Sequence, residues 1–282
     1  MRFGSQSMIE PLKTVLVRRP DESFAVDDPE LWGYPERPDV ARAQQEHDEF
    51  VGILKDSGAE VIYHQEHLGD RADAIFVRDP AMVISDGAII FQMKKELRRG
   101  EEDGIRRCLE KLGVPILHQF SDDVFMDGGD LVWIDRETLA VGQGTRTGKE
   151  GFEQLQKLLS RHGIRVIPVP FEGAPHLCSV LCIVHYNTAV VMPEYLTASF
   201  CELLEESGFK LITLPEEEDD SLGINILTLS PGKCLMIDGN PITMERLIAA
   251  GCEVMTYRGD EISVKGGGGP LCLTQPLLRE TE

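Results

Sequence analysis

The chain has 282 residues, of which 42% are hydrophobic and 27% charged, a composition typical of a globular protein with a sizeable core. Its formal net charge of −20 repels nucleic acid and anionic lipid, so neither is an expected partner. The simplest role of this charge is to keep the surface solvated. Apolar runs all fall short of the roughly 20 residues that a membrane-spanning helix needs, so no membrane association is expected.

A repeated pattern runs along the whole chain. Five times, a helix-like stretch ends at a glycine, and a short β-branched strand follows it. A glycine at a helix C-terminus commonly adopts the left-handed conformation. Residues 41–56 and 152–162 show the apolar spacing of amphipathic helices before two of these glycines. The five positions are Gly58, Gly113, Gly163, Gly208 and Gly251.

Each of the first four strands is followed by a hairpin-like pair, with two β-rich runs around a polar turn. The four pairs lie within residues 81–93, 130–142, 179–192 and 224–237. The fifth unit is split, because its last strand falls within residues 270–278 and its partner within 14–20. A chain whose two ends complete one unit closes into a ring. We therefore predict an α/β ring of five units, and a single domain over residues 1–282, since no linker-like segment interrupts it.

A ring of this kind brings loops from different units to one central cavity. Four stretches occupy comparable positions in their own units, just before or at the edge of a hairpin. They are "DAIFVRDP" (73–80), "FMDGGD" (125–130), "PHLCS" (175–179) and "GGGGPLC" (266–272). The repeat thus predicts that these four stretches form one site.

The thiol of Cys272 is the first candidate for chemistry in this site. Free cysteine usually packs as a small hydrophobe, but a core strand does not need the four glycines that precede this one. We expect the glycines to turn the backbone tightly and to present the thiol at the cavity. A nucleophilic cysteine needs an acid or base, and that group needs an orienting partner. His176 and Asp127 are the candidates for these roles, whereas Asp130 is expected to cap a turn.

The run "HLCSVLCIVH" (176–185) raises the alternative of a metal site. In a strand, however, His176, Cys178 and Cys182 would face one side and His185 the other. The run also lacks the tight Cys-x-x-Cys spacing of a zinc knuckle. We therefore expect no metal, and core packing for Cys178 and Cys182.

Charged residues near the other two stretches indicate the ligand. Asp73 and Asp79 are six residues apart, so on an extended strand they would face the same side. Two carboxylates suit a planar cation with several donors, such as a guanidinium. Arg98 and Arg146 could bind a carboxylate at the other end. These residues suit a small amino acid that carries a guanidine, and surface ion pairs are the alternative.

The seven cysteines are scattered singly, without a Cys-x-x-Cys pair, and Met1 does not begin a secretory signal. A disulfide framework is therefore not expected, and a reducing cytoplasm is the expected location.

Six motifs, in this order, resemble the guanidino-group modifying enzymes of the pentein fold. They are "DAIFVRDPAMV", "LRRGEE", "FMDGGDLVW", "VGQGTRT", "PHLCS" and "GGGGPLCLTQPLLRE", which span residues 73–280. This superfamily includes dimethylarginine dimethylaminohydrolase, arginine deiminase and the amidinotransferases. The resemblance implies a five-bladed αβ propeller with pseudo-fivefold symmetry. It also implies an enzyme without a metal or other cofactor, whose partner is a small guanidino amino acid.

The resemblance also implies residue roles. Cys272 would be the nucleophile, His176 the general acid and base, and Asp127 the residue that orients this histidine. Asp79 and Asp73 would hold the guanidinium, and Arg98 and Arg146 would bind the α-carboxylate.

Only a few positions indicate which subfamily of these enzymes the chain resembles most. The "MDGGD" motif and the spacing of Asp73 and Asp79 are similar to the dimethylarginine hydrolases, and Cys178 stands where arginine deiminases have aspartate. Arg78, in contrast, stands where the dimethylarginine enzymes have glutamate. The favoured function is hydrolysis of N-methylated arginine to citrulline and an amine through a covalent thiouronium intermediate. The alternatives are an arginine deiminase or dihydrolase, an amidinotransferase, and a non-catalytic pentein ring such as translation initiation factor 6. A homo-oligomer is left open.

Overall fold

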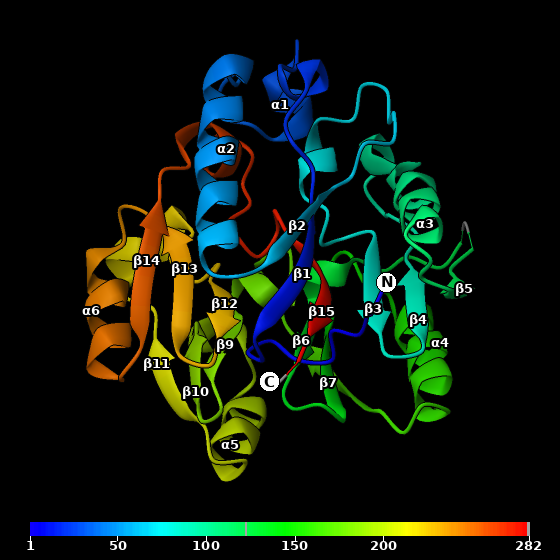
Figure 1. Cartoon of the computed structure of the whole chain (residues 1–282). Coiled ribbons are helices and arrows are strands. Elements are labelled where there is room, and N and C mark those ends of the chain that lie inside the picture. Colours follow the sequence, from blue (N-terminus) through cyan, green and yellow to red (C-terminus); the bar gives the residue numbers. More distant parts are fainter. Residues whose placement is uncertain (122, 281–282) are drawn as a thin grey trace.

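The structure is a computed structural model that describes residues 1–121 and 123–280 (Figure 1). It contains five three-stranded sheets, and each has the same pattern of pairing. A middle strand pairs antiparallel with one neighbour and parallel with the other. The sheets are β15 (Gln275–Arg279), β1 (Leu12–Val17) and β2 (Glu60–Tyr63); β3 (Ala81–Ile84), β4 (Gly87–Ile90) and β5 (Ile116–Gln119); β6 (Leu131–Trp133), β7 (Thr138–Gln143) and β8 (Arg165–Pro170); β9 (Leu181–His185), β10 (Thr188–Val191) and β11 (Lys210–Thr213); and β12 (Leu227–Ser230), β13 (Lys233–Ile237) and β14 (Glu253–Tyr257).

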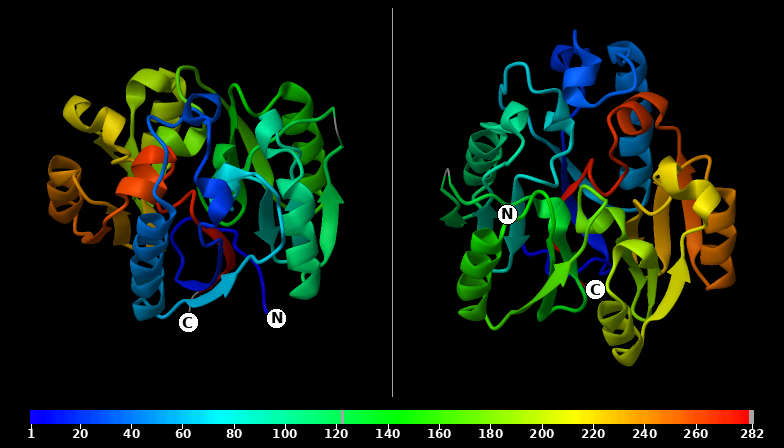
Figure 2. Two further views of the ribbon diagram at one scale, coloured as in Figure 1. Left: turned by 90° about the horizontal axis from the view of Figure 1, so that it is seen from above. Right: turned by 180° about the vertical axis from the view of Figure 1, so that it is seen from behind.

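The α-helices lie around the outside of the sheets (Figure 2). They are α1 (Pro29–Trp32), α2 (Val40–Asp56), α3 (Glu101–Lys111), α4 (Lys149–Ser160), α5 (Ala198–Glu206) and α6 (Pro241–Ala249). The helices α2 to α6 each connect the middle strand of a sheet to its parallel neighbour, as a parallel pairing requires. The predicted α/β ring of five units is therefore confirmed.

The five glycines that were expected to end the helices all have a left-handed backbone. Their φ angles lie between 73° and 93°. Helices α2, α3, α4, α5 and α6 end two or three residues before them. A side chain in this conformation is strained, so glycine fixes the point at which each helix stops and the chain turns back into the sheet.

The split unit closes the ring as expected. Strand β15 pairs antiparallel with β1, from Leu12 opposite Arg279 to Leu16 opposite Gln275. In Figure 1 the loop before β15 and β15 itself lie near the middle of the molecule. The residues that precede β15 are thus carried to the axis of the ring, where the predicted site should be.

Short helical turns, not strands, precede the hairpins at this axis. They are the 3-10 turns Ala72–Ile75, Gly128–Asp130 and Leu177–Ser179, and the π-helical turn Asp260–Lys265. The expectation that Asp73 and Asp79 lie on one extended strand is therefore wrong, because the Phe76 amide bonds back to the Asp73 carbonyl and bends the chain.

Within residues 1–121 and 123–280, the structure has no helix that is both long and apolar enough to span a bilayer.

Candidate active site

The thiol of Cys272 lies in the turn before β15 and is only 7% exposed. It is therefore more deeply buried than the expectation of a presented thiol suggested. The Asn225 side-chain amide donates a hydrogen bond to its Sγ at 3.0 Å. The Oδ1 atom of the same Asn225 accepts a hydrogen bond from the Leu271 amide at 3.0 Å. Asn225 thus holds both the sulfur and the backbone that carries it.

The four glycines before Cys272 are explained by close packing. A Cβ added to Gly266 or Gly268 would lie 2.7 or 2.5 Å from the ring of Phe76. One added to Gly269 would lie 2.7 Å from Asn225 Oδ1. The fourth, Gly267, has a φ of 75°, which disfavours a side chain by itself. The run lets the loop pack against Phe76 and Asn225 at distances that no other residue allows.

His176 and Asp127 form a buried pair, as predicted. His176 Nε2 lies 3.0 Å from Asp127 Oδ2, and Arg146 Nη1 lies 3.4 Å from the same oxygen. Burial alone would lower the pKa of His176, but the charge of Asp79 and the bond to Asp127 outweigh it and raise the pKa to about 10. The imidazole is therefore protonated at neutral pH and can act as a proton donor.

Asp130 does more than cap a turn. Its carboxylate is fully buried, and its Oδ1 accepts a hydrogen bond from the Leu177 amide at 3.0 Å. This bond ties the "FMDGGD" stretch to the residue after His176. Burial raises the pKa of Asp130 to about 6, although the nearby His176 opposes the shift.

The two glycines of this stretch have a steric role. A Cβ at Gly128 would lie 2.3 Å from the backbone oxygen of Arg78, and one at Gly129 would lie 2.7 Å from the His176 ring. The second Cβ would also lie 2.9 Å from Asp79 Oδ1. His176 and Asp79 therefore flank the same glycine.

Asp79 and Asp73 are both buried, but their oxygens differ in what they already bind. Asp73 Oδ1 accepts a hydrogen bond from the Tyr34 hydroxyl at 2.8 Å, and Asp73 Oδ2 forms an ion pair with Lys95 Nζ at 2.7 Å. Asp79 Oδ2 lies 2.5 Å from Arg98 Nη1, whereas its Oδ1 has no partner in the part of the chain that the structure describes. Burial would raise the pKa of Asp79, but His176 and Arg98 outweigh it and lower the pKa.

The guanidinium of Arg98 is buried and occupied. Besides Asp79, it donates to both carboxylate oxygens of Glu101 at 2.7–3.1 Å and to the Phe76 carbonyl at 3.0 Å. Arg146, by contrast, keeps 24% of its side chain exposed. The structure brings both arginines to the site. Arg98 is part of an internal ion pair, whereas Arg146 is a partly exposed cation.

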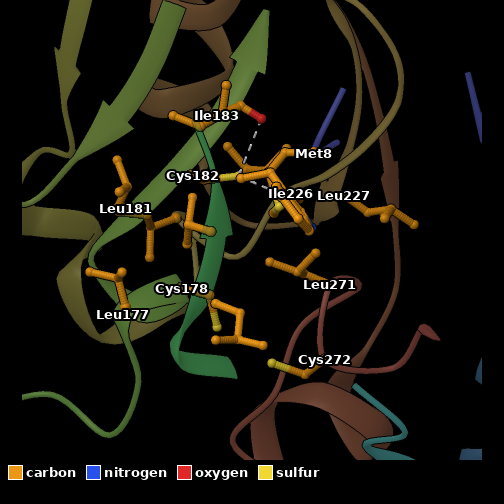
Figure 3. Packing of buried hydrophobic residues seen from close by; sticks show 14 of the residues in the cluster. Met8, Leu177, Cys178, Leu181, Cys182, Ile183, Ile226, Leu227, Leu271 and Cys272 are labelled. Carbon is orange, nitrogen blue, oxygen red and sulfur yellow. Dashed lines mark hydrogen bonds between the residues drawn. The ribbon is translucent and has the colours of Figure 1, made fainter. Parts of the chain in front are cut away.

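Cys178 lies in the same buried cluster as Cys272, as the predicted convergence of their two stretches implies. The hydrogen bond with the Cys178 thiol is the largest cause that lowers the pKa of Cys272; burial opposes it, and Asn225 and His176 add to the lowering. Figure 3 shows the two side chains in one cluster of buried residues. The expectation that Cys178 only packs in the core is thus incomplete. Cys182 does pack there, with its thiol donating to the Ile226 carbonyl at 3.1 Å.

The metal alternative was rejected from strand geometry, but residues 177–179 form a 3-10 turn, so that reasoning does not hold at this end of the run. Among the described residues, no three His, Cys, Asp or Glu side chains are placed to hold a metal ion. Of the two reasons for the rejection, only the lack of a Cys-x-x-Cys knuckle still holds there.

Sequence reasoning missed Asn225. This residue stands at the start of the fourth hairpin stretch, 224–237, a position comparable to that of the four chosen motifs in their own units. The repeat could have indicated it. Glu101, which holds Arg98, gave no such signal, because its carboxylate lies in an ordinary helical charge pattern in α3.

Comparisons with known proteins identify the family of the chain. The chain is 28% identical to a dimethylarginine dimethylaminohydrolase of Streptomyces coelicolor, over 86% of this chain and 89% of the relative. It is 25% identical to the enzyme of that name from Pseudomonas aeruginosa, over 84% and 89%. An arginine deiminase of Listeria monocytogenes is 26% identical, over 73% of this chain and 61% of the relative.

Solved structures share the fold. The dimethylarginine dimethylaminohydrolase of Pseudomonas aeruginosa complexed with citrulline superposes with a TM-score of 0.78 at 24% identity, over 94% of this chain and 99% of that one. The N-terminal domain of a cyanobacterial arginine dihydrolase superposes with a TM-score of 0.82 at 21% identity, over 95% and 98%. The family model described as N,N dimethylarginine dimethylhydrolase, eukaryotic, matches residues 31–279. The chain therefore belongs to the N,N dimethylarginine dimethylhydrolase family, pentein-fold hydrolases that act on C–N bonds of guanidino groups.

Proposed function

We propose that this hydrolase cleaves the guanidino C–N bond of N-methylated L-arginine and releases citrulline and an amine. One observation carries the proposal: the buried Asp79 Oδ1, without a partner among the described residues, lies beside His176, and the amide of the preceding Arg78 donates to the Cys272 carbonyl at 3.3 Å. A buried carboxylate oxygen without a donor is costly. A guanidinium would supply that donor, and its central carbon would then lie close to the nucleophile.

The proposed mechanism is covalent. The Cys272 thiolate attacks the guanidinium carbon, and a tetrahedral adduct forms. His176 transfers its proton to the departing amine as the C–N bond breaks, which leaves a thiouronium on Cys272. The neutral His176 then takes a proton from water, and the resulting hydroxide attacks the same carbon. The C–S bond breaks to release the thiolate and citrulline, whose hydroxyl proton passes to the released amine. Asp127 orients the imidazole in both steps.

Substrate choice follows from the number of free acceptors. A guanidinium of unmodified arginine has five donors, whereas both oxygens of Asp73 and one of Asp79 are already occupied. Each buried donor left unpaired costs about 1–3 kcal/mol. Methylation removes donors and adds apolar surface, which the neighbouring Cys178 thiol tolerates better than a carboxylate would.

We assign the α-carboxylate of the substrate to Arg146 and Arg98. The role of Arg146 is supported by its partial exposure and its single long contact with Asp127. Arg98 would have to exchange part of its bonding to Asp79 or Glu101 for the substrate, so its contribution depends on a rearrangement. Without a carboxylate to bind, agmatine should be a poor substrate.

Unmodified arginine is the second candidate substrate, as in a deiminase or dihydrolase. It is favoured by Arg78, which stands where the dimethylarginine enzymes have glutamate, and by the similarity to an arginine deiminase.

For the protein as a whole, we propose one domain over residues 1–282, a cytoplasmic location and no cofactor, nucleic-acid or membrane partner. We make no choice between monomer and homo-oligomer.

Specificity constants decide between these substrates. Asymmetric dimethylarginine, monomethylarginine, arginine and agmatine should be compared by the citrulline or carbamoyl product formed, with Cys272→Ser as the inactive control. We expect the methylated arginines to have the highest kcat/KM. A clear preference for arginine would replace the methylarginine assignment with a deiminase or dihydrolase. A preference for agmatine would overturn the roles of Arg98 and Arg146.

A further inference from the structure

The site contains a second thiol that the proposed mechanism does not use. Cys178 follows His176 by two residues, in the 3-10 turn Leu177–Ser179, and it is fully buried. It belongs to the same cluster of buried residues as Cys272. In Figure 3 the two side chains extend from different segments into the same space, with their sulfur atoms between those segments.

The two thiols are chemically unlike. Hydrogen bonding from Cys178 and Asn225 and the nearby charge of His176 favour the thiolate at Cys272, although burial opposes it. The interaction with Cys272, and next burial, raise the pKa of the Cys178 thiol, so this thiol stays protonated. A reactive thiolate in contact with a protonated second thiol is the arrangement in which oxidation of the first sulfur is followed by capture by the second.

We propose that Cys178 and Cys272 form a reversible disulfide when the protein meets a peroxide. The proposal rests on the role assigned to Cys272 under the proposed function. In the first step the Cys272 thiolate attacks a peroxide oxygen, the O–O bond breaks, and the departing oxygen takes a proton from protonated His176, so the products are a sulfenic acid and an alcohol or water. In the second step the Cys178 sulfur attacks the sulfenic sulfur, its proton passes to the leaving hydroxyl, and water departs. The two electrons that reduce the peroxide come from the pair of thiols.

The loop around Cys272 can accommodate the bond. A disulfide requires Cα atoms about 4.4–6.8 Å apart and a specific dihedral angle, so small backbone adjustments are usually needed. Gly266, Gly268 and Gly269 are tightly packed, so Gly267, which has open space beside it, is the position where the backbone can make such an adjustment. The bond would remove the nucleophile and break its contact with Asn225, so the oxidised protein should be inactive. A dithiol would restore both thiols by exchange.

The chain offers an internal control for the pairing. Cys234 on β13 and Cys252, directly before β14, also lie at neighbouring positions, because Cys234 pairs with Val254 in this sheet. They belong to a different sheet from β15 and take no part in the proposed mechanism. The Cys234 thiol lowers the pKa of Cys252 to about 7, although burial opposes it, so this pair has a similar asymmetry. Its oxidation should leave the activity unchanged, because the activity depends on Cys272.

The test uses the full chain, hydrogen peroxide and two single variants, Cys178→Ser and Cys234→Ser. After treatment, free thiols are blocked with N-ethylmaleimide, and peptides are mapped by mass spectrometry without reduction. Activity is measured before and after dithiothreitol, and each variant is compared with its own untreated rate. We expect the wild type and Cys234→Ser to lose at least about tenfold in rate, to contain the Cys178–Cys272 peptide, and to recover with dithiothreitol. Cys178→Ser should lose activity irreversibly, with Cys272 oxidised to sulfinic acid.

Two results would overturn the proposal. One is a wild type whose Cys272 reaches sulfinic acid while Cys178 stays free. The other is a Cys178→Ser variant that recovers as fully as the wild type. If Cys178→Ser does not fold, the peptide map of the wild type decides alone. Should the protein form the disulfide but turn over no guanidino compound, the proposed function fails and the thiol pair stands.

Discussion

Replacing Asp127 with Asn tests the centre of the proposed mechanism. The change keeps the shape of the side chain and removes the charge that faces His176 across 3.0 Å. An asparagine oxygen can still accept the bond from Nε2. Its amide nitrogen would then have to take the place of Oδ1 in a fully buried position. We expect a large loss of kcat and a small change in KM.

The magnitude follows from what Asp127 contributes. A hydrogen bond to a charged group is worth about 1.5–3 kcal/mol, which corresponds to a fall of about one to two units in the pKa of His176. From about 10, this leaves the imidazole mainly protonated at pH 7. The lost rate therefore reflects poorer orientation of the acid and base, a contribution of about 10²–10⁴-fold. The alkaline limb of the kcat/KM profile should also move to lower pH by about one to two units.

Steady-state kinetics from pH 6 to 11 measure both effects. Asp86→Asn is a matched control, because Asp86 makes a similar bond of 2.6 Å to His162 at an exposed pair. It should leave kcat and the pH profile unchanged. A normal rate in Asp127→Asn would show that Asp127 serves only the turn. An unchanged alkaline limb, with kcat reduced, would show that the charge of Asp127 does not support the imidazolium.

Three further changes test the site. Cys272→Ser should lower turnover at least about 10³-fold with little change in the thermal midpoint, since it removes the nucleophile but little volume; a retained rate would exclude covalent catalysis by Cys272. Gly129→Ala places a Cβ 2.7 Å from the His176 ring. It should lower the free energy of unfolding by about 1–3 kcal/mol and also lower kcat. Gly148→Ala, with open space among the described atoms, should change neither quantity. Arg146→Ala should raise KM for arginine derivatives about 10–100-fold and affect agmatine much less; equal effects on both would remove its assigned role.

The ring and the main site could be predicted because both depend on local signals that recur. Each of the five glycines lies at the end of an apolar helical pattern, and each marks the same turn in the structure. The repeat then places Cys272, His176 and Asp127 at comparable positions, so their convergence follows from topology. Asp130 was assigned to a turn because its sequence context resembles one, but its partner Leu177 belongs to another unit.

The remaining features of the site depend on pairings between units that leave no local pattern. Tyr34 binds Asp73 across 39 positions, and Asn225 reaches the Cys272 sulfur across 47. Arg98 was predicted to bind a ligand carboxylate, and the buried acids that surround it were not foreseen, because a single arginine in a loop gives no sign of them. Cys178 was expected to pack with Cys182 because strand alternation was assumed where a 3-10 turn occurs.

The charge of the protein and the charge of the site act at different distances. The net charge of −20 favours the approach of a cationic guanidinium, but salt screens this attraction beyond about 8–10 Å. Arginine and its methylated derivatives have the same charge, so the outer field treats them alike. Under the proposed function, discrimination arises from the buried acceptors, where Asp79 Oδ1 is unoccupied within the described chain and each oxygen of Asp73 already accepts one bond. The free acceptor positions of these oxygens, and not the number of carboxylates, would then set how many guanidinium donors are satisfied.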